Sequence, residues 1–159
     1  MIDAVMIRRI LDYDPDTGVF RWREHFKLNY VGAVAGCSMS SGYRRLGIAG
    51  KRYYEHRLAW LYTYGIWPTN QIDHINNVKD DNRICNLREA TVSQNHANKS
   101  KYKGELLKGV KKHPHGKFSA RISINNKEKY LGIYDTEEQA HAAYCEAAQK
   151  EFGAYHRAG

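Results

Sequence analysis

Residues 71–98 read QIDHINNVKDDNRICNLREATVSQNHAN, a stretch in which polar side chains crowd the ends of short apolar segments. The residues up to His74 are expected to end a short strand, and the Asn/Asp-rich run after them to form a loop. Leu87–Ala90 can return as a second strand. Thr91, with Gln94 three residues later, is a capping box that predicts a helix start. A strand–loop–strand–helix unit would bring the end of its first strand beside its helix.

Side chains that could carry out chemistry lie at the end of the first expected strand and on the expected helix. Asp73 and Asn95 could offer oxygen atoms to one hard cation such as Mg²⁺. His74 follows Asp73 directly, and an imidazole with an ordinary pKa of about 6.5 suits a general base. His96, the neighbour of Asn95, is a rival for the second ligand position. An Asp-His pair alone is a weak signal, whereas the three-part constellation around a capping box is a specific one.

The motifs at these spacings resemble the HNH nuclease family, whose active site is of the ββα-metal type. The resemblance rests on the Asp-His pair, on Asn-Arg-x-x-Asn-Leu-Arg over 82–88 and on Ser-Gln-Asn over 93–95. Three earlier stretches resemble the phage and intron-homing members of the family: 11–22, 55–60 and 67–68. The similarity therefore covers most of residues 9–99.

This resemblance implies a divalent-metal-dependent DNA endonuclease that hydrolyses phosphodiester bonds, of the phage homing or nicking type. By position, His74 would deprotonate the attacking water. Asp73 and Asn95 would hold one Mg²⁺ or Mn²⁺ per active site, and the metal would neutralise charge on the scissile phosphate. Asn95 fits the homing-type spacing better than His96 does.

The loop between the two expected strands would aim the catalytic histidine. By the same resemblance, Asn86 is a catalytic-site residue that clamps the loop through backbone groups, and Asn82 could help it. Arg83 or Arg88 could hold a phosphate of the DNA. Some relatives stabilise this motif with a zinc site of four cysteines. This sequence has no counterpart of that site, so no structural zinc is expected.

The positive charge of the chain is concentrated behind this segment. Residues 99–129 contain ten Lys and Arg but only Glu105 and Glu128 as acids, while the whole chain carries a net charge of +8. Such a block releases counterions when it meets a phosphate backbone, which favours nucleic-acid binding. A solvated lysine face or a flexible linker would carry the same charge.

Residues 107–153 resemble the DNA-binding domains of the APETALA/ethylene-response-factor type. This resemblance implies a three-stranded antiparallel sheet, backed by one helix, that enters the major groove. The residues that fall at the family's DNA contacts are Lys111, Lys112, His115, Lys117, Arg121 and Tyr130. His115 and Tyr130 replace Trp, and Lys111 and Lys112 replace Arg. Lysine lacks the planar fork that reads guanine, so phosphate anchoring is expected rather than sharp base readout.

The expected fold class is α+β, with an HNH nuclease domain and its N-terminal extension over 1–99, a basic linker over 100–108 and the second DNA-binding domain over 109–159. The N-terminal extension is expected to begin with a helix over Ala4–Tyr13, capped by Asp3, whose apolar side carries Val5, Met6, Ile10 and Leu11. A turn over 14–18, a strand from Val19, a hairpin over 43–54 and a helix over 54–64 follow.

Composition narrows the remaining classes. The chain has 159 residues, lacks an apolar run of about 18 residues and has an acid early at its N-terminus, so neither a membrane span nor a signal peptide is expected. Three distant cysteines argue for a reducing cytoplasm (Cys37, Cys85 and Cys145). The expected partner is double-stranded DNA, without membrane or small-molecule cofactor, and a monomer is the default. The main rival is a non-cleaving DNA-binding regulator with an inactive HNH motif.

Overall fold

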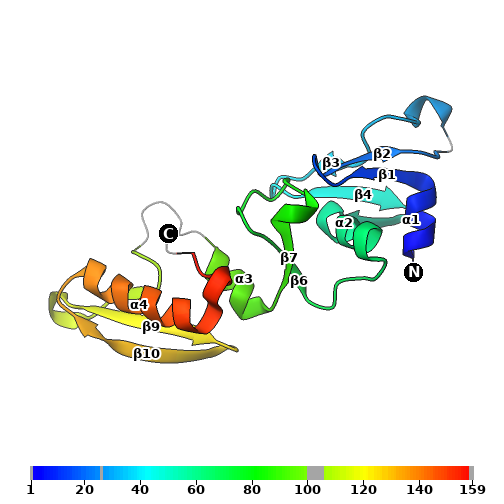
Figure 1. Cartoon of the computed structure of the whole chain (residues 1–159). Helices are drawn as coiled ribbons and strands as arrows, with labels where there is room; N and C mark the ends of the chain where they lie inside the picture. Colours follow the sequence, from blue (N-terminus) through cyan, green and yellow to red (C-terminus); the bar gives the residue numbers. More distant parts are fainter. Residues whose placement is uncertain (1, 26, 100–105, 158–159) are drawn as a thin grey trace. The chain divides into compact units, whose positions relative to one another are not determined.

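The computed structural model describes residues 2–25, 27–99 and 106–157. The chain forms two compact units, Met1–Glu89 and Ala90–Gly159, and each is described by itself (Figure 1). None of the described helices is both long enough and apolar enough to cross a bilayer.

The first unit carries three small sheets and two α-helices. Its elements are α1 (Ala4–Ile10), β1 (Leu11–Asp14), β2 (Val19–Trp22), η1 (Leu28–Tyr30), β3 (Cys37–Ser38), β4 (Arg44–Ile48), β5 (Lys51–Tyr54), α2 (Glu55–Tyr64), β6 (Gln71–His74), η2 (Ile84–Asn86) and β7 (Leu87–Ala90, whose last residue belongs to the second unit). The sheets are the antiparallel β1–β2 hairpin, the antiparallel β3–β4–β5 sheet and the β6–β7 pair.

The second unit is one sheet covered by a long helix. Its elements are α3 (Val92–Asn98), β8 (Val110–Lys112), η3 (Pro114–Gly116), β9 (Phe118–Ile124), β10 (Lys127–Tyr134), α4 (Glu137–Phe152) and η4 (Gly153–Tyr155). The antiparallel strand order is β10–β9–β8. Helix α4 begins at the capping box of Thr136 and Gln139 and buries Ala140, Tyr144 and Ala148. The α+β class predicted from the sequence is confirmed. The predicted linker lies outside the described residues over 100–105, and the domain limits stay a prediction.

The N-terminal helix is shorter than predicted. Asp3 caps it as expected, accepting a hydrogen bond from the Met6 amide at 2.8 Å, but α1 ends at Ile10. Leu11 begins β1 instead, because its backbone pairs with β2 and its side chain is completely buried. The predicted apolar side was also wrong for Val5, which is 79% exposed, while Ile7 faces the core.

The core of the first unit joins the N-terminal hairpin to α2. Completely buried apolar side chains come from α1, β1, β2, β4 and α2: Ile7, Leu11, Phe20, Leu46 and Leu58. Burying each side chain of this size stabilises the fold by about 1.5–3 kcal/mol before conformational entropy is counted. Two polar side chains, Glu55 and Asn82, are equally buried beside them.

The turn between β1 and β2 presses on the loop that follows β6. Gly18 has a φ of +74°, and a Cβ built there would lie 2.5 Å from the Arg83 nitrogen and 2.6 Å from the Asn82 carbonyl carbon. Backbone atoms cannot swing away as a flexible side chain can. The turn and the loop therefore require glycine at this position.

We expect Gly18→Ala to lower the free energy of unfolding by roughly 2–5 kcal/mol, because positive φ and a backbone clash add. Gly32→Ala is the matched control, since Gly32 has a φ of +81° with nothing within 4 Å of its Cβ position. It should cost about 1–2 kcal/mol. Urea unfolding of both variants checks this, and equal losses would show that the contact with the loop is unimportant.

Candidate active site

Asp73 and His74 end strand β6 with their side chains inside the first unit. Asp73 is 3% exposed and His74 is 5% exposed. Arg88, from the neighbouring strand β7, donates from Nε to Asp73 Oδ2 at 2.8 Å. A buried carboxylate needs such a partner, since removing it from water unpaired is costly. The β6–β7 pairing thus supplies the counter-charge of Asp73.

His74 is held by a buried amide. Its Nε2 lies 3.2 Å from Asn82 Oδ1. The rings of Tyr43 and His56 surround it, with centroids at 5.9 Å and 5.2 Å. Burial lowers the pKa of His74, against the smaller opposing effects of Asn82 and Asp73. The ring is therefore held neutral at pH 7, which is the state a general base requires.

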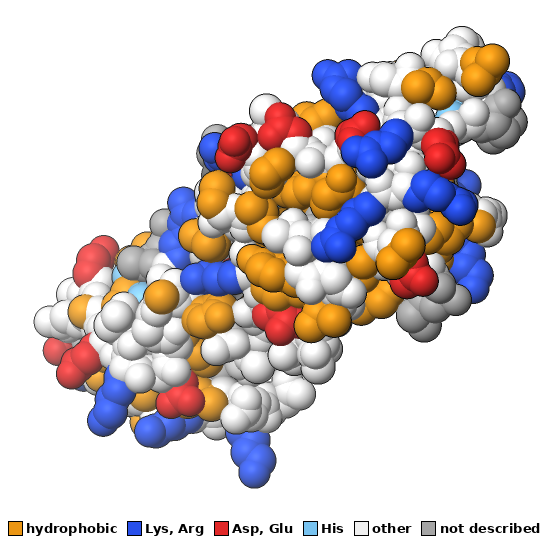
Figure 2. All heavy atoms as spheres, turned by 45° about the vertical axis from the view of Figure 1, so that its right-hand side comes forward, with side chains coloured by type: hydrophobic (Ala, Val, Ile, Leu, Met, Phe, Trp, Pro, Cys, Tyr) orange, Lys and Arg blue, Asp and Glu red, His pale blue; other side chains and the backbone are white. Residues whose placement is uncertain are grey.

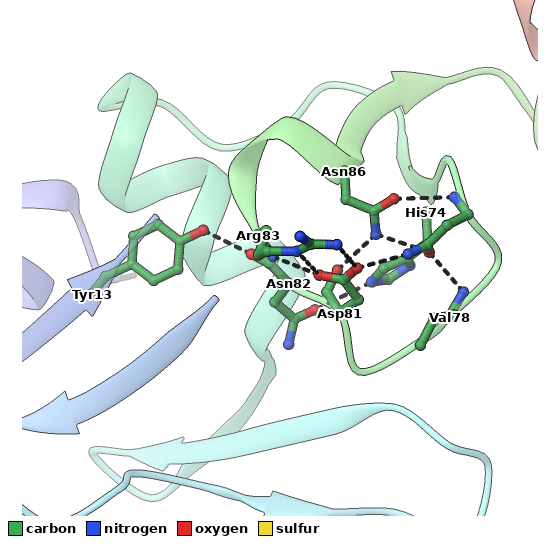
Figure 3. Close-up of polar contacts among 8 residues, drawn as sticks. Tyr13, His74, Val78, Asp81, Asn82, Arg83 and Asn86 are labelled. Carbon is green, nitrogen blue, oxygen red and sulfur yellow. Dashed lines mark hydrogen bonds and ion pairs between the residues drawn. The ribbon is translucent and has the colours of Figure 1, made fainter. Parts of the chain in front are cut away.

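Asn86 closes the loop between His74 and β7. Its Oδ1 accepts from the Asn76 amide at 3.0 Å, and its Nδ2 donates to the Asp81 carbonyl at 2.8 Å and to Asn76 Oδ1 at 3.0 Å (Figure 3). The Ile75 amide donates to the Asn86 carbonyl at 3.0 Å. The Asn86 side chain therefore joins Asn76 to Asp81, and its backbone carbonyl holds Ile75.

Helix α2 brings two further polar residues that the sequence analysis did not assign. Glu55 is completely buried, and its Oε2 accepts from Arg44 Nε at 2.8 Å. His56 is 8% exposed and stacks on Tyr54 at 5.3 Å. The only signal in the sequence was that both residues lie in the stretch 55–60 that carries the homing-type resemblance.

The family comparison falls on these elements. Residues 53–97 match the HNH endonuclease family model. The matched range contains Glu55 and His56 as well as the Asp73–His74 pair and Asn86. The chain is also 33% identical over 116 residues to an uncharacterized HNH endonuclease of Acanthamoeba polyphaga mimivirus. The aligned part is 72% of this chain and 61% of that protein, so the chain spans less than two thirds of this relative.

Both arginines predicted to hold a phosphate in the HNH segment are paired with carboxylates. Arg83 donates to Asp81 at 2.8 Å from Nε and at 2.6 Å from Nη2 (Figure 3). The Arg83 guanidinium lowers the pKa of Asp81 to about 2. Arg88 is the partner of Asp73. To bind DNA, the guanidinium of either arginine would have to be shared between its carboxylate partner and a phosphate.

The second half of the HNH segment lies on α3, in the second unit. Thr91 and Gln94 form the predicted capping box, and the Asn95 amide donates to the Thr91 carbonyl at 2.9 Å. His96 lines a hollow of about 270 Å³ within this unit, beside Lys108 and Arg121. Burial lowers the pKa of His96, and the charges of Lys99 and Lys108 lower it further. These positive charges also disfavour the binding of a metal cation to the His96 ring.

The donor atoms of the HNH segment suit a hard cation. Among the described residues, no group of three or more His, Cys, Asp or Glu side chains is placed to hold a metal ion. The predicted protein donors are one carboxylate, Asp73, and one amide oxygen, Asn95. Mg²⁺ is commonly bound by one or two carboxylates together with water and substrate phosphate, so each of these oxygen donors is of a kind that it prefers.

The sheet of the second unit carries the predicted DNA contacts. Lys111 and Arg121 both pair with Glu128, at 3.1 Å and 2.7 Å. Lys117 pairs with Asp135 at 2.9 Å. The three other predicted contacts, Lys112, His115 and Tyr130, are exposed. Figure 2 shows Lys and Arg side chains and acidic side chains both scattered over the face in view.

We expect the buried His56 of helix α2 to make the fold acid-sensitive. Burial lowers the pKa of His56 from 6.5 to about 3. As the pH falls through 6.5, the unfolded chain therefore binds a proton at His56 and the folded chain does not. The stabilising effect is complete above pH 6.5 and is lost as the pH falls toward 3, by about 2 kcal/mol at pH 5.

Urea unfolding at pH 5 and pH 7 measures this loss. His56→Phe keeps a ring but cannot take the proton, so its stability should fall less between the two pH values. An identical fall in wild type and variant would show that His56 is not the group responsible.

Proposed function

We propose that the chain is a divalent-metal-dependent DNA endonuclease of the HNH type, which hydrolyses phosphodiester bonds as a homing or nicking enzyme of phage kind. The observation that carries the proposal is the buried, neutral His74 at the end of β6. It is held through one nitrogen by Asn82, beside Asp73, on a loop closed by Asn86. The match of residues 53–97 to the HNH endonuclease model supports it.

His74 is the proposed general base. Its Nε2 donates to the Asn82 amide oxygen, so the lone pair of the neutral ring lies on Nδ1, which takes a proton from water. The fixed ring then directs the resulting hydroxide at the phosphorus. Asp73 and Asn95 are the residues we propose to hold Mg²⁺ or Mn²⁺, on the strength of the family resemblance. When bound, the ion supplies charge neutralisation on the phosphate and the departing oxygen.

The second unit is proposed to hold double-stranded DNA. It resembles an APETALA-type domain in sequence, and its antiparallel sheet and covering helix α4 are of the kind that this resemblance predicts. Lys111, Arg121 and Tyr130 would meet the duplex, mainly through phosphates. A cytoplasmic location and a monomeric state complete the proposal.

The alternative is a DNA-binding regulator whose nuclease motif does not cut. Asp73, His74 and Asn95 are all present, and the loop after His74 is closed by the hydrogen bonds of Asn86, which favours the enzyme. A regulator would bind DNA equally with and without metal and would cleave no substrate.

The decisive variant is His74→Ala in a plasmid-cleavage assay with Mg²⁺. We expect cleavage to fall by about 100-fold or more, since a positioned general base contributes that much. DNA affinity should stay unchanged. His25→Ala, a histidine of the same unit outside the site, is the control and should cut like wild type. If His74→Ala also cuts like wild type, the base is assigned wrongly.

The paired charges of the sheet make a second expectation about DNA binding. Glu128→Gln removes the carboxylate shared by Lys111 and Arg121, so both cations become available to phosphate. We expect DNA affinity at low salt to rise about two- to tenfold, given the small energies of exposed ion pairs.

Glu146→Gln changes the net charge equally but lies on the exposed face of α4, where it serves as the control. Affinities of both variants measured over a range of salt concentrations separate the two effects. An equal gain in both variants would mean that only net charge matters.

A further inference from the structure

We infer that Asn82 is a positioning residue for His74, and that its own amide is oriented by Glu55 of helix α2. In this arrangement Glu55 selects the nitrogen of His74 that acts as the base. The inference rests on the proposed function, in which His74 is the general base.

The amide of Asn82 is sealed inside the first unit. Asn82 has no exposed surface, and its Oδ1 lies 3.2 Å from His74 Nε2. An amide oxygen can only accept a hydrogen bond, so Nε2 must carry the hydrogen. The opposite orientation of the amide would present NH₂ to the ring and would select the other tautomer. What fixes the amide therefore fixes the histidine.

Glu55 supplies that constraint. Glu55 Oε1 and Asn82 Nδ2 are both buried, and neither meets a partner at standard hydrogen-bond geometry. Burial raises the pKa of Glu55, and the nearby Asn82 side chain opposes that rise, as Arg44 does more strongly. One atom is an acceptor and the other is a donor, so each is the natural partner of the other. With Nδ2 turned toward the carboxylate, Oδ1 faces His74.

Two further contacts hold the Glu55 carboxyl in place. Arg44 Nε donates to Oε2 at 2.8 Å, and Arg44 Nη2 also donates to the Ala35 carbonyl at 3.1 Å. Gly36 backs the other oxygen so closely that a Cβ there would lie 2.2 Å from Oε1. One oxygen of the Glu55 carboxyl is thus paired with Arg44, and the other is packed closely against Gly36.

The backbone of Asn82 is anchored separately. The buried Tyr13 hydroxyl donates to the Asn82 carbonyl at 2.7 Å (Figure 3). The backbone N–H of Asn82 donates to the backbone carbonyl of Asp80 at 3.0 Å. Together with the close approach of Gly18, these contacts hold the backbone of Asn82, so the orientation of its side-chain amide is what we assign to Glu55.

The test uses the full-length protein labelled with ¹⁵N-histidine, since the nitrogen shifts report which ring nitrogen carries the hydrogen. Wild type should show His74, assigned by comparison with His74→Ala, as the Nε2–H tautomer. Asn82→Leu, which has a similar volume and no acceptor, should lose this preference. Single-turnover cleavage should slow by about 10- to 100-fold with the KM for DNA within twofold. An unchanged tautomer and unchanged rate would overturn the inference.

A rescue pair separates positioning from a merely structural role. Asn82→Asp alone sets a carboxylate against Glu55 and should slow cleavage. Adding Glu55→Gln restores a donor facing an acceptor, so the double variant should regain the Nε2–H tautomer and most of the rate. Failure of the rescue in a folded double variant would contradict the inference. Asn70→Asp, an exposed asparagine of the same unit, is the control.

The two proposals fail in different ways. A wild type that shows the Nε2–H tautomer but cuts no DNA would end the proposed endonuclease function and leave the Glu55–Asn82–His74 arrangement standing. A wild type that cuts DNA but keeps its tautomer in Asn82→Leu would do the reverse.

Discussion

The first unit depends on a buried polar core that must be satisfied from several directions at once. Glu55, Asn82 and His74 come from a helix, a loop and a strand end, and all three side chains are withdrawn from water. Burying a charge or an amide without partners costs several kcal/mol, so the apolar packing around Phe20 and Leu58 has to offset it. Such a core stabilises less than an apolar one would, but it allows one arrangement of its side chains.

Several of the cations that could meet DNA are likewise paired with carboxylates. Arg88 faces Asp73, Arg83 faces Asp81, and Glu128 lies between Lys111 and Arg121. The total of 25 Lys and Arg residues therefore overstates how many cations are ready for phosphate. Binding by such a surface exchanges one anionic partner for another, which makes it sensitive to salt and to the geometry of the backbone it meets.

Local signals predicted much of this fold. The capping box of Thr91 and Gln94, the turn ending at Gly18 and the β4–β5 hairpin all depend on neighbouring residues, and all were visible in the sequence. The end of α1 was missed because the conformation of Leu11 is determined by its pairing with β2 and not by the helical spacing of apolar residues. Glu55 was missed for a similar reason: its partners are brought to it only by the fold.

The close approach of Gly18 to the Asn82–Arg83 backbone has a consequence for how this protein can vary. The N-terminal hairpin is part of the wall behind the loop of the site, so the two segments have to change together. Grafting the hairpin from a relative onto this chain, without the matching loop, would place a foreign turn against the residue that holds His74. A chimera should therefore exchange the hairpin together with the Asn82–Arg83 loop, not the hairpin alone.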